Sequence, residues 1–263
     1  MPRLDSLRTI FISDLHLGSR ACRIDLLLDF LRSTQCDTLY LVGDIMDLEC
    51  MRRSFYWPES HTEALRAILE MSQRGTRVVY VPGNHDDDFR ALAGQMLGPV
   101  EIVRRDIHTT GDGRRLLVLH GDEFDQFLGS KSMVNVAGRL AYRALLGLNR
   151  LVHWWHDLRG RPYWSLAQHL KTRLPGAVDY VENFQRACIR AAREEGVNGV
   201  VCGHIHHAAI IEDNGFVYCN DGDWVESCTT VVEDLEGRLS LLTWTEKSRP
   251  AGQVVGLPYS EAA

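Results

Sequence analysis

The sequence has no C-x-x-C pair, although it contains seven cysteines. Their odd number and their scatter along the chain indicate neither a disulfide framework nor a zinc knuckle, and a reducing compartment suits them best. No stretch of about 18 consecutive apolar residues occurs, which argues against a membrane-spanning helix. The first fourteen residues also lack the apolar core of a signal peptide, because Asp5, Arg8 and Asp14 interrupt it. We therefore expect a cytoplasmic protein.

An excess of positive charge is missing as well. The net charge of −6 gives the chain as a whole no general preference for nucleic acid, so no nucleic-acid partner is expected. The 263 residues are 45% hydrophobic. That is enough for a sizeable core, in one large domain or in a domain with an insertion.

Five apolar runs that each stop at Asp, Asn or His are the main feature that the sequence does have. Short apolar runs of this length are typical of buried strands, and a carboxylate and an imidazole at a strand end can ligate one cation. Five of the eleven histidines lie in these motifs. The runs are 9–13 before Asp14-Leu15-His16, 38–42 before Gly43-Asp44, 77–81 before Pro82-Gly83-Asn84-His85-Asp86, 116–119 before His120-Gly121-Asp122, and 200–202 before Gly203-His204-Ile205-His206.

Each motif also has a simpler interpretation when it is taken alone. Asp14 fits a turn, the Asn84-His85-Asp86 stretch fits a polar loop, and Asp47 fits a helix N-cap as well as a residue that supports a metal ligand from behind. Asp44 is different, because Gly43 lets the backbone turn sharply and a projecting carboxylate can bridge two cations. The ordered set of strand ends favours a metal centre over unrelated turns.

Other helices and strands are predicted between these five runs and after the last of them. Helical periodicity predicts helices at 22–33, 60–73 and 177–195. Apolar segments at 208–211, 215–219, 229–233 and 239–244 predict antiparallel strands, joined by hairpin turns at Asn214-Gly215, Asp221-Gly222 and Glu236-Gly237. The tail after Pro250 is expected to be loosely held.

Residues 126–175 have a helical, aromatic and basic character. Eight basic residues stand there against one acid, Asp157. Such a segment suits an anionic lipid, a membrane surface or a phosphorylated amphiphile, and it predicts a peripheral contact with the inner face of the plasma membrane. The alternative is that its apolar faces only pack on the core. His153 and His156 share a helix face, which fits an interface as well as a third metal site.

The ordered motifs D-x-H, GD, GNHD, HG and GHIH resemble those of the calcineurin-like metallophosphoesterase superfamily. The resemblance implies an α/β fold, a four-layer α/β/β/α sandwich with the active site at one edge of its sheets. The implied core is 1–125 with 176–250, the implied helical insertion or cap is 126–175, and the tail is 251–263.

The resemblance also implies roles for the motif residues. One metal ion would be held by Asp14, His16, Asp44 and His206, and a second by Asp44, Asn84, His120 and His204. His85 would act near the leaving oxygen as a stabiliser or proton donor, and Asp47 would orient it. Oxygen and imidazole ligands without thiolate suit Mn²⁺, Fe²⁺ or Zn²⁺, and the family parallel favours Mn²⁺.

A closer resemblance is to the UDP-2,3-diacylglucosamine diphosphatase-like branch of this superfamily. It is carried by HGDEFD at 120–125, by Tyr163-Trp164-Ser165 with Lys171, and by the segment 220–226. It implies substrate contacts from Asp125, Ser165 and Lys171, and His85 departs from it because the branch carries Arg there.

The predicted activity is therefore cleavage of a pyrophosphate or phosphoester in a lipid-linked or nucleotide-linked substrate. The alternatives are a phosphodiesterase or phosphomonoesterase acting on another small phosphorylated molecule, a nuclease, and a non-catalytic scaffold. A scaffold would be expected to lack some of the ligands or the His85 equivalent, and here all are present. The sequence carries no signal for an oligomeric state.

Overall fold

The computed structural model describes residues 4–125 and 175–245. The chain divides into two compact units, Met1–Asp122 with Cys188–Ala263, and Glu123–Ala187. Nearly all of the predicted insertion and the whole predicted tail lie outside the described residues, so those boundaries stay predictions. None of the described helices is both long and apolar enough to cross a bilayer.

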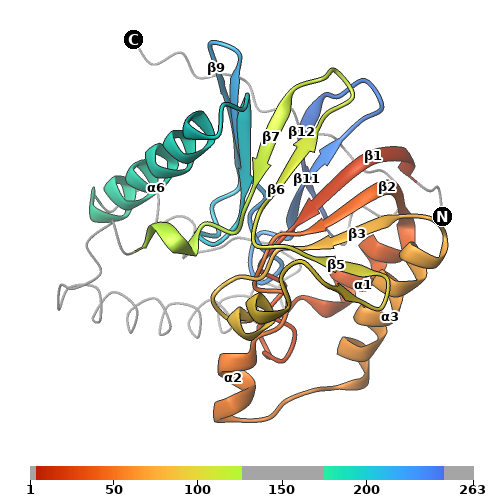
Figure 1. The fold of residues 1–263 in the computed structure, drawn as a ribbon. Coiled ribbons are helices and arrows are strands. Elements are labelled where there is room, and N and C mark those ends of the chain that lie inside the picture. Colours follow the sequence, from red (N-terminus) through yellow and green to blue (C-terminus); the bar gives the residue numbers. More distant parts are fainter. Residues whose placement is uncertain (1–3, 126–174, 246–263) are drawn as a thin grey trace, which may run out of the picture. The chain divides into compact units, whose positions relative to one another are not determined.

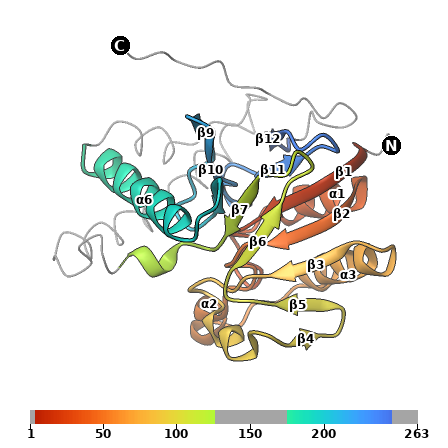
Figure 2. The same ribbon diagram turned by 45° about the horizontal axis from the view of Figure 1, so that its top comes forward.

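Two sheets form the first unit (Figure 1). The seven-stranded sheet has the order β12-β11-β1-β2-β3-β5-β4, and Figure 2 shows β1, β2, β3, β5 and β4 side by side. Its strands are β1 Leu4–Ile12, β2 Thr34–Leu41, β3 Arg77–Tyr80, β4 Met96–Leu97, β5 Val100–Ile102, β11 Thr229–Glu233 and β12 Leu239–Thr243. The five-stranded sheet has the order β6-β7-β8-β10-β9, with β6 Asp106–Thr109, β7 Arg115–Val118, β8 Gly199–Cys202, β9 Ala209–Asp213 and β10 Phe216–Asn220.

The central parallel strands are apolar on both faces because both faces are covered. Along β1, the side chains of Ile10 and Ile12 join the outer core, whereas Phe11 between them joins a second core together with Leu116 and Val201 of the other sheet. All of these side chains are fully buried. The two sheets therefore pack face to face, and the predicted α/β sandwich is confirmed.

Helices α1 (Ile24–Ser33) and α3 (Glu59–Gln73) match the predicted helices and cover the outer face of the seven-stranded sheet. Their buried apolar side chains contribute to the outer core. Phe30 of α1 packs against Trp224 and Trp244, with ring centroids 5.1 and 5.4 Å apart. Helix α6 (Pro175–Glu194) matches the third prediction, and the shorter elements α2 (Leu48–Arg53), η1 (Asp87–Leu92) and η2 (Asp122–Phe124) were not predicted.

Two of the three predicted hairpin turns are confirmed. Strands β9 and β10 pair antiparallel around Asn214-Gly215, and β11 pairs antiparallel with β12 around Glu236-Gly237. The predicted hairpin at Asp221-Gly222 is wrong, because β10 and β11 belong to different sheets and the chain crosses between them there. The physical reason is that Asp221 is fully buried and contacts Ser13 at the end of β1, so this turn crosses the interior.

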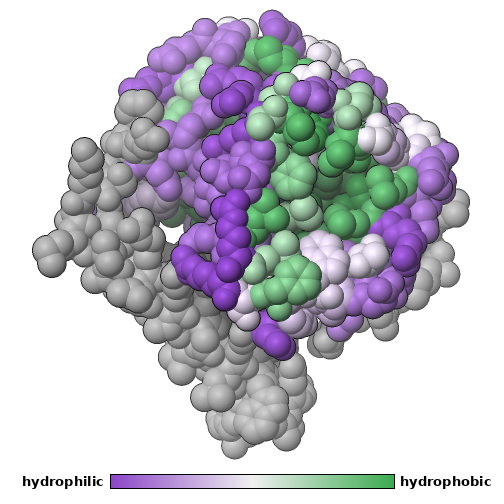
Figure 3. Space-filling model, turned by 60° about the horizontal axis from the view of Figure 1, so that its bottom comes forward, coloured by the Kyte–Doolittle hydropathy of each residue, from purple (hydrophilic) through white to green (hydrophobic). Residues whose placement is uncertain are grey.

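A hollow lined by apolar side chains, with a hydrophilic border, lies on the face shown in Figure 3. Several apolar residues of the first unit pack against the outer core and stay only partly buried, among them Met46, Trp57, Phe89 and Leu92. Phe55, in the connection between α2 and α3, is 79% exposed. Apolar surface with a polar rim is typical of a contact site for a ligand or partner.

A buried His108–Glu233 contact links the two sheets. The His108 Nε2 and Glu233 Oε2 atoms lie 2.7 Å apart, and Glu233 Oε1 accepts a 2.7 Å hydrogen bond from the Gly111 N–H. Burial alone would raise the pKa of Glu233, but the hydrogen bonds from His108, Thr9 and Gly111 lower it below the usual range. The ionised carboxylate is therefore the form that the folded state stabilises.

We expect Glu233→Gln to lower the free energy of unfolding at pH 7 by about 1–3 kcal/mol, since it leaves a buried polar group badly paired. Because the folded-state pKa is the lower one, the wild-type stabilisation is complete above about pH 4.3, the ordinary pKa of Glu, and is lost as the pH falls through the folded value. Urea unfolding at pH 7 and at lower pH measures both effects. Glu236→Gln is the matched control on an exposed side chain, and an equal loss in both variants would contradict the prediction.

Candidate metal centre

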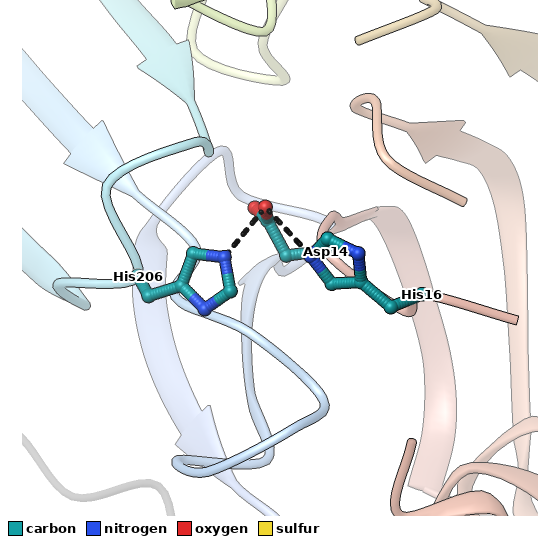
Figure 4. Close-up of side chains that lie close together, drawn as sticks. All are labelled: Asp14, His16 and His206. Atoms are coloured by element: carbon teal, nitrogen blue, oxygen red, sulfur yellow. Dashed lines mark ion pairs between the residues drawn. The ribbon is translucent and has the colours of Figure 1, made fainter. Parts of the chain in front are cut away.

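The ends of β1 and β8 bring the first group of candidate ligands together. Asp14 and His16 follow β1, and His206 lies in the turn after β8. Figure 4 shows both imidazoles turned toward the Asp14 carboxylate. The Nε2 atom of His206 lies 3.0 Å from Asp14 Oδ1, and that of His16 lies 3.8 Å from the same oxygen. A carboxylate and two imidazoles from two different sheets thus converge on one point.

A second group forms from Asp44, His120 and His204, which follow β2, β7 and β8. The His120 Nε2 atom lies 3.4 Å from Asp44 Oδ2, and the rings of His120 and His204 have centroids 5.2 Å apart. Within each of these two groups the ligand atoms lie within 4.8 Å of one another. Each group therefore has the size and the donor types of a divalent-metal site.

Asp47 connects a third group. Its Oδ2 lies 3.3 Å from His16 Nδ1 and its Oδ1 lies 3.0 Å from His85 Nδ1, while the rings of His16 and His85 meet edge to face at 4.7 Å. Asp47 is also the N-cap of α2 and accepts a 2.8 Å hydrogen bond from the Cys50 N–H. The sequence left open whether Asp47 caps a helix or supports an imidazole. In the structure this one side chain does both.

The backbone at most of these candidate ligands has the same unfavourable conformation. Seven non-glycine residues in the described part of the chain have positive φ, and five of them are Asp14, His16, Asp44, His204 and His206, with φ from 50° to 69°. This left-handed region is unfavourable for residues with a side chain, and it is tolerated mainly where function requires it. Strand β8 ends at Cys202, before the two histidines. Gly203-His204-Ile205-His206 therefore forms a turn and does not continue the strand.

In both central carboxylates, one oxygen accepts hydrogen bonds from backbone N–H or hydroxyl groups and the other faces imidazoles. Asp14 Oδ2 accepts hydrogen bonds from the Ser13 hydroxyl at 2.5 Å and from the His204 N–H at 2.9 Å. Asp44 Oδ1 accepts the His85 N–H at 2.8 Å. The second oxygen of each faces imidazole nitrogens. A carboxylate held in this way has a fixed ligand oxygen.

Two buried atoms test whether a cation fits. Asp14 Oδ1 and His120 Nε2 make no hydrogen bond of good geometry among the described residues. Asp14 Oδ1 faces the imidazoles of His206 and His16, and His120 Nε2 faces its ion-pair partner Asp44. The Nδ1 atom of His120 lies 2.8 Å from the Val42 carbonyl oxygen and donates to it, which directs the Nε2 lone pair at Asp44. Buried polar atoms without partners are costly. A divalent ion would satisfy both atoms, so the residues fit the metal ions that the motifs predict.

The titration of these groups favours a cation as well. Burial alone would raise the pKa of Asp44, but the neighbouring His120 and His16 charges hold it well below the usual range. Burial opposes the charged form of His16, yet the Asp47 hydrogen bond and the Asp44 and Asp14 charges raise its pKa to about 9. A divalent cation held by these side chains would replace the imidazole protons, so metal binding would release protons.

The other predicted site residues are placed as follows. Asn84 lies between Gly83 and His85 in the loop after β3, and its side chain is exposed. Asp125 belongs to the second unit, where its Oδ1 accepts a 2.8 Å hydrogen bond from the Tyr180 hydroxyl of α6. Ser165 and Lys171 lie outside the described residues, as do His153 and His156.

Asp86 is a buried residue of the site that the sequence interpretation missed. It accepts hydrogen bonds from the Ile45 N–H at 2.7 Å, the Gly83 N–H at 2.6 Å and the Tyr80 hydroxyl at 2.5 Å. It thereby ties the Asp44 loop to the loop that carries His85. The only signal was its place in the GNHD motif, where an acid in a polar turn is expected to be exposed.

Arg90 and Asp122 form a second tie that the sequence did not reveal. The Arg90 Nη2 atom lies 2.7 and 2.8 Å from the two Asp122 oxygens and 3.2 Å from the Pro82 carbonyl oxygen. The pair connects the loop after β3 with the loop after β7, and so connects the two sheets beside the metal groups.

The segment from Asn220 to Trp224 contacts the two turns that carry the first group of candidate ligands. The Asn220 side-chain amide donates to the Gly203 carbonyl at 2.6 Å, the Trp224 N–H donates to the Asp14 carbonyl at 3.1 Å, and Asp223 Oδ2 lies 3.8 Å from His206 Nδ1. The sequence marked this segment only as part of a resemblance. Its contacts join the turn after β8 to the end of β1.

This sandwich with paired carboxylate and imidazole groups at its strand ends defines a class of protein. The profile described as calcineurin-like phosphoesterase matches residues 7–208, and the chain belongs to this family. It is accordingly a metal-dependent hydrolase of phosphorus ester or anhydride bonds. The recognition of the superfamily from its motifs is confirmed.

The chain is also similar to curated proteins with a specific name. It is 27% identical over 241 residues to the UDP-2,3-diacylglucosamine hydrolase of Neisseria gonorrhoeae (strain ATCC 700825 / FA 1090), covering 81% of this chain and 88% of that protein. It is 24% identical to the UDP-2,3-diacylglucosamine hydrolase of Haemophilus influenzae (strain PittGG), covering 85% and 93%. Among solved structures, Vacuolar Protein Sorting 29 from Cryptosporidium parvum matches with a TM-score of 0.47 at 13% identity, covering 90% and 91%.

Proposed function

We propose that this protein is a dinuclear-metal phosphohydrolase that cleaves the pyrophosphate of a nucleotide-linked glycolipid such as UDP-2,3-diacylglucosamine. The observation that carries the metal part is the pair of groups Asp14–His16–His206 and Asp44–His120–His204. The names of the relatives, which align over about four fifths of the chain, support the substrate part. In this proposal Asp44 serves both ions and Asn84 completes the second site.

The residues at the two sites set the chemistry. Divalent ions bound there would attract an anionic phosphoryl group, lower the pKa of an attacking water and offset charge in the transition state. Neutral imidazoles and carboxylates without thiolate suit Mn²⁺, and Fe²⁺ and Zn²⁺ fit the same ligands. The Ser13 and His204 contacts keep Asp14 in one orientation, and the His85 N–H does the same for Asp44.

His85 is suited to act at the leaving oxygen. Its Nδ1 contacts Asp47 Oδ1 at 3.0 Å, which leaves Nε2 for the substrate, and its side chain is 25% exposed. Burial alone would lower the pKa of His85, but the Asp47 hydrogen bond and the nearby Asp44 and Asp47 charges raise it. His85 therefore holds a proton on Nε2 that it can donate or share as charge grows on the leaving oxygen.

An amphiphilic substrate agrees with the apolar surface of the first unit. Met46 follows the Asp44 turn, and Phe89 and Leu92 follow His85 in the chain. All three are only partly buried, so part of their apolar surface is open to solvent. We further propose that Asp125, Ser165 and Lys171 contact the substrate and that the basic, aromatic segment 126–175 contacts the inner face of the plasma membrane.

The test compares substrates on Mn²⁺-loaded protein. UDP-2,3-diacylglucosamine should be hydrolysed with release of UMP, and a chelator should abolish the reaction. Parallel assays use UDP-N-acetylglucosamine, bis-p-nitrophenyl phosphate, a phosphomonoester and single-stranded DNA. An enzyme that turns over the small esters but leaves the diacylated substrate intact would contradict the proposed substrate, and inertness on every substrate would contradict the phosphohydrolase assignment.

A second candidate function rests on His85. The diphosphatase branch that the motifs resemble carries Arg at this position, so a phosphodiester or phosphomonoester of another small molecule is the alternative substrate. Preferential hydrolysis of a small ester in the same panel would favour it.

A further inference from the structure

A second carboxyl group lies behind Asp14, connected to it by one hydroxyl. Ser13 Oγ lies 2.5 Å from Asp14 Oδ2 and 2.6 Å from Asp221 Oδ1. Asp221 follows β10, where the chain crosses from one sheet to the other, and its side chain is fully buried. It is outside the three groups of candidate metal ligands.

The contacts of Ser13 with Asp14 and with Asp221 can both be hydrogen bonds only if one of the two carboxyl groups is protonated. A serine hydroxyl donates one proton, so Ser13 can donate to only one of its two close carboxyl neighbours. Asp14 Oδ1 faces the imidazoles of His206 and His16, and its Oδ2 accepts the His204 N–H, so the surroundings of this carboxyl suit the ionised form. Asp221 is fully buried, and its Oδ2 has no hydrogen-bond partner among the described residues. Burying an unpaired charge is costly, so the proton belongs on Asp221.

The hydrogen bonds then run in one direction. With the proton on Asp221, the 2.6 Å contact between Asp221 Oδ1 and Ser13 Oγ would be a hydrogen bond from the carboxyl, and the Ser13 hydroxyl would keep its 2.5 Å hydrogen bond to Asp14 Oδ2. The His204 N–H donates to the same Asp14 oxygen at 2.9 Å. Asp14 Oδ2 is thus engaged by two donors, and Oδ1 alone is left to face His206 at 3.0 Å.

The arrangement is enclosed by the turn after β8. A Cβ atom placed on Gly203 would lie 2.3 Å from Ser13 Oγ and 2.7 Å from Asp14 Oδ2, so the backbone of this turn passes directly over the hydroxyl. Asn220, beside Asp221, holds the same turn through its 2.6 Å hydrogen bond to the Gly203 carbonyl. The packing leaves little room for a water that could replace the Ser13 hydroxyl or the Asp221 carboxyl.

We propose that Ser13 and Asp221 are positioning residues that hold Asp14 through Oδ2 and thereby present Oδ1 to a divalent ion. The neutral Asp221 carboxyl supplies a donor without adding a second negative charge behind Asp14. This inference rests on the proposed function, because it takes Asp14 as a metal ligand.

The test is the Mn²⁺ affinity of five proteins, measured by equilibrium dialysis: the wild type and the variants Ser13→Ala, Asp221→Leu, Asp221→Asn and Thr76→Val. Ser13→Ala and Asp221→Leu should each weaken binding by about 10–100-fold, the usual cost of losing a group that supports a ligand. Asp221→Asn should stay close to wild type, because its amide keeps a neutral donor of the same shape at Ser13.

Thr76→Val is the control for a purely structural effect. It removes a buried hydroxyl that donates to the Cys36 carbonyl at 2.7 Å, away from the strand ends that carry the ligands. Urea unfolding of all variants reports stability. A structural role alone would lower the stability of Thr76→Val and Ser13→Ala alike without a selective loss of Mn²⁺ affinity, and this result would overturn the proposal.

The remaining outcomes separate the inference from the proposed function. A wild-type protein that binds no Mn²⁺ would contradict the proposed function itself. Normal Mn²⁺ binding by the wild type, Ser13→Ala and Asp221→Leu would leave that function intact and overturn the positioning role. Equal losses in Asp221→Asn and Asp221→Leu would overturn the neutral donor. Should Asp221→Leu fail to fold, Ser13→Ala, which removes a single oxygen, still decides the question.

Discussion

Asp44→Asn is expected to abolish Mn²⁺-dependent phosphohydrolase activity. Asp44 is 2% exposed, its Oδ2 lies 3.4 Å from His120 Nε2, and its Oδ1 accepts the His85 N–H at 2.8 Å. An amide keeps the shape but removes the negative charge that two bound cations would share. Metal ions contribute several kcal/mol to such reactions, so we expect kcat/KM to fall by roughly 10³-fold or more.

The measurements are hydrolysis of bis-p-nitrophenyl phosphate and metal content after dialysis against Mn²⁺. Asp44→Asn should lower both values, whereas Asp87→Asn, which changes an exposed carboxyl at the start of η1, should leave both unchanged. An Asp44→Asn protein that keeps full metal content and full activity would remove Asp44 from the metal centre.

His85→Gln is expected to lower kcat by about 10²–10⁴-fold, the usual contribution of general acid–base catalysis, while the bound Mn²⁺ stays near the wild-type amount. His85 reaches Asp47 through Nδ1, and its pKa is raised there, so its Nε2 is suited to proton donation. A p-nitrophenolate leaving group needs little protonation and an alkoxide needs much. The loss should therefore be smaller for a p-nitrophenyl ester than for an alkyl ester.

Glu49→Gln is the matched control for His85→Gln. The Glu49 Oε2 atom lies 3.9 Å from His85 Nδ1, and the Glu49 side chain is 45% exposed, so solvent screens its charge. We expect little change in kcat for this variant. Equal losses of His85→Gln on both kinds of ester would argue against proton donation and for a role in charge stabilisation alone.

Local sequence patterns predicted the elements that have a clear periodicity or a long apolar run. The apolar run before Asp14 lies in β1, a strand that is buried on both faces. The segment 22–33, whose apolar residues have helical spacing, contains α1. The strands β4, β5 and β6 were not predicted. β4 has two residues and β5 has three, too few for a periodicity to show, and the sequence of β6, Asp-Ile-His-Thr, is no apolar run.

The hairpin at Asp221-Gly222 was wrong for a different reason. An Asp-Gly pair between two apolar segments is equally typical of a tight turn and of a crossing between sheets. The difference lies in the partners of β10 and β11, which are β8 and β9 for one strand and β1 and β12 for the other. The pairing of β11 with β1, from the other end of the described chain, leaves no local signal.

The sequence by itself determined which side chains lie at the strand ends. A buried strand needs apolar residues, so the first polar residues after an apolar run mark the point where the strand ends. Tertiary structure alone decided what each of these side chains contacts: that Asp47 serves His16 and His85 together, that Asp86 is buried, and that Asp221 lies behind Asp14. The physical reason is that a hydrogen bond depends on the position of both partners to within a few tenths of an ångström. Only the packing of the two sheets fixes those positions.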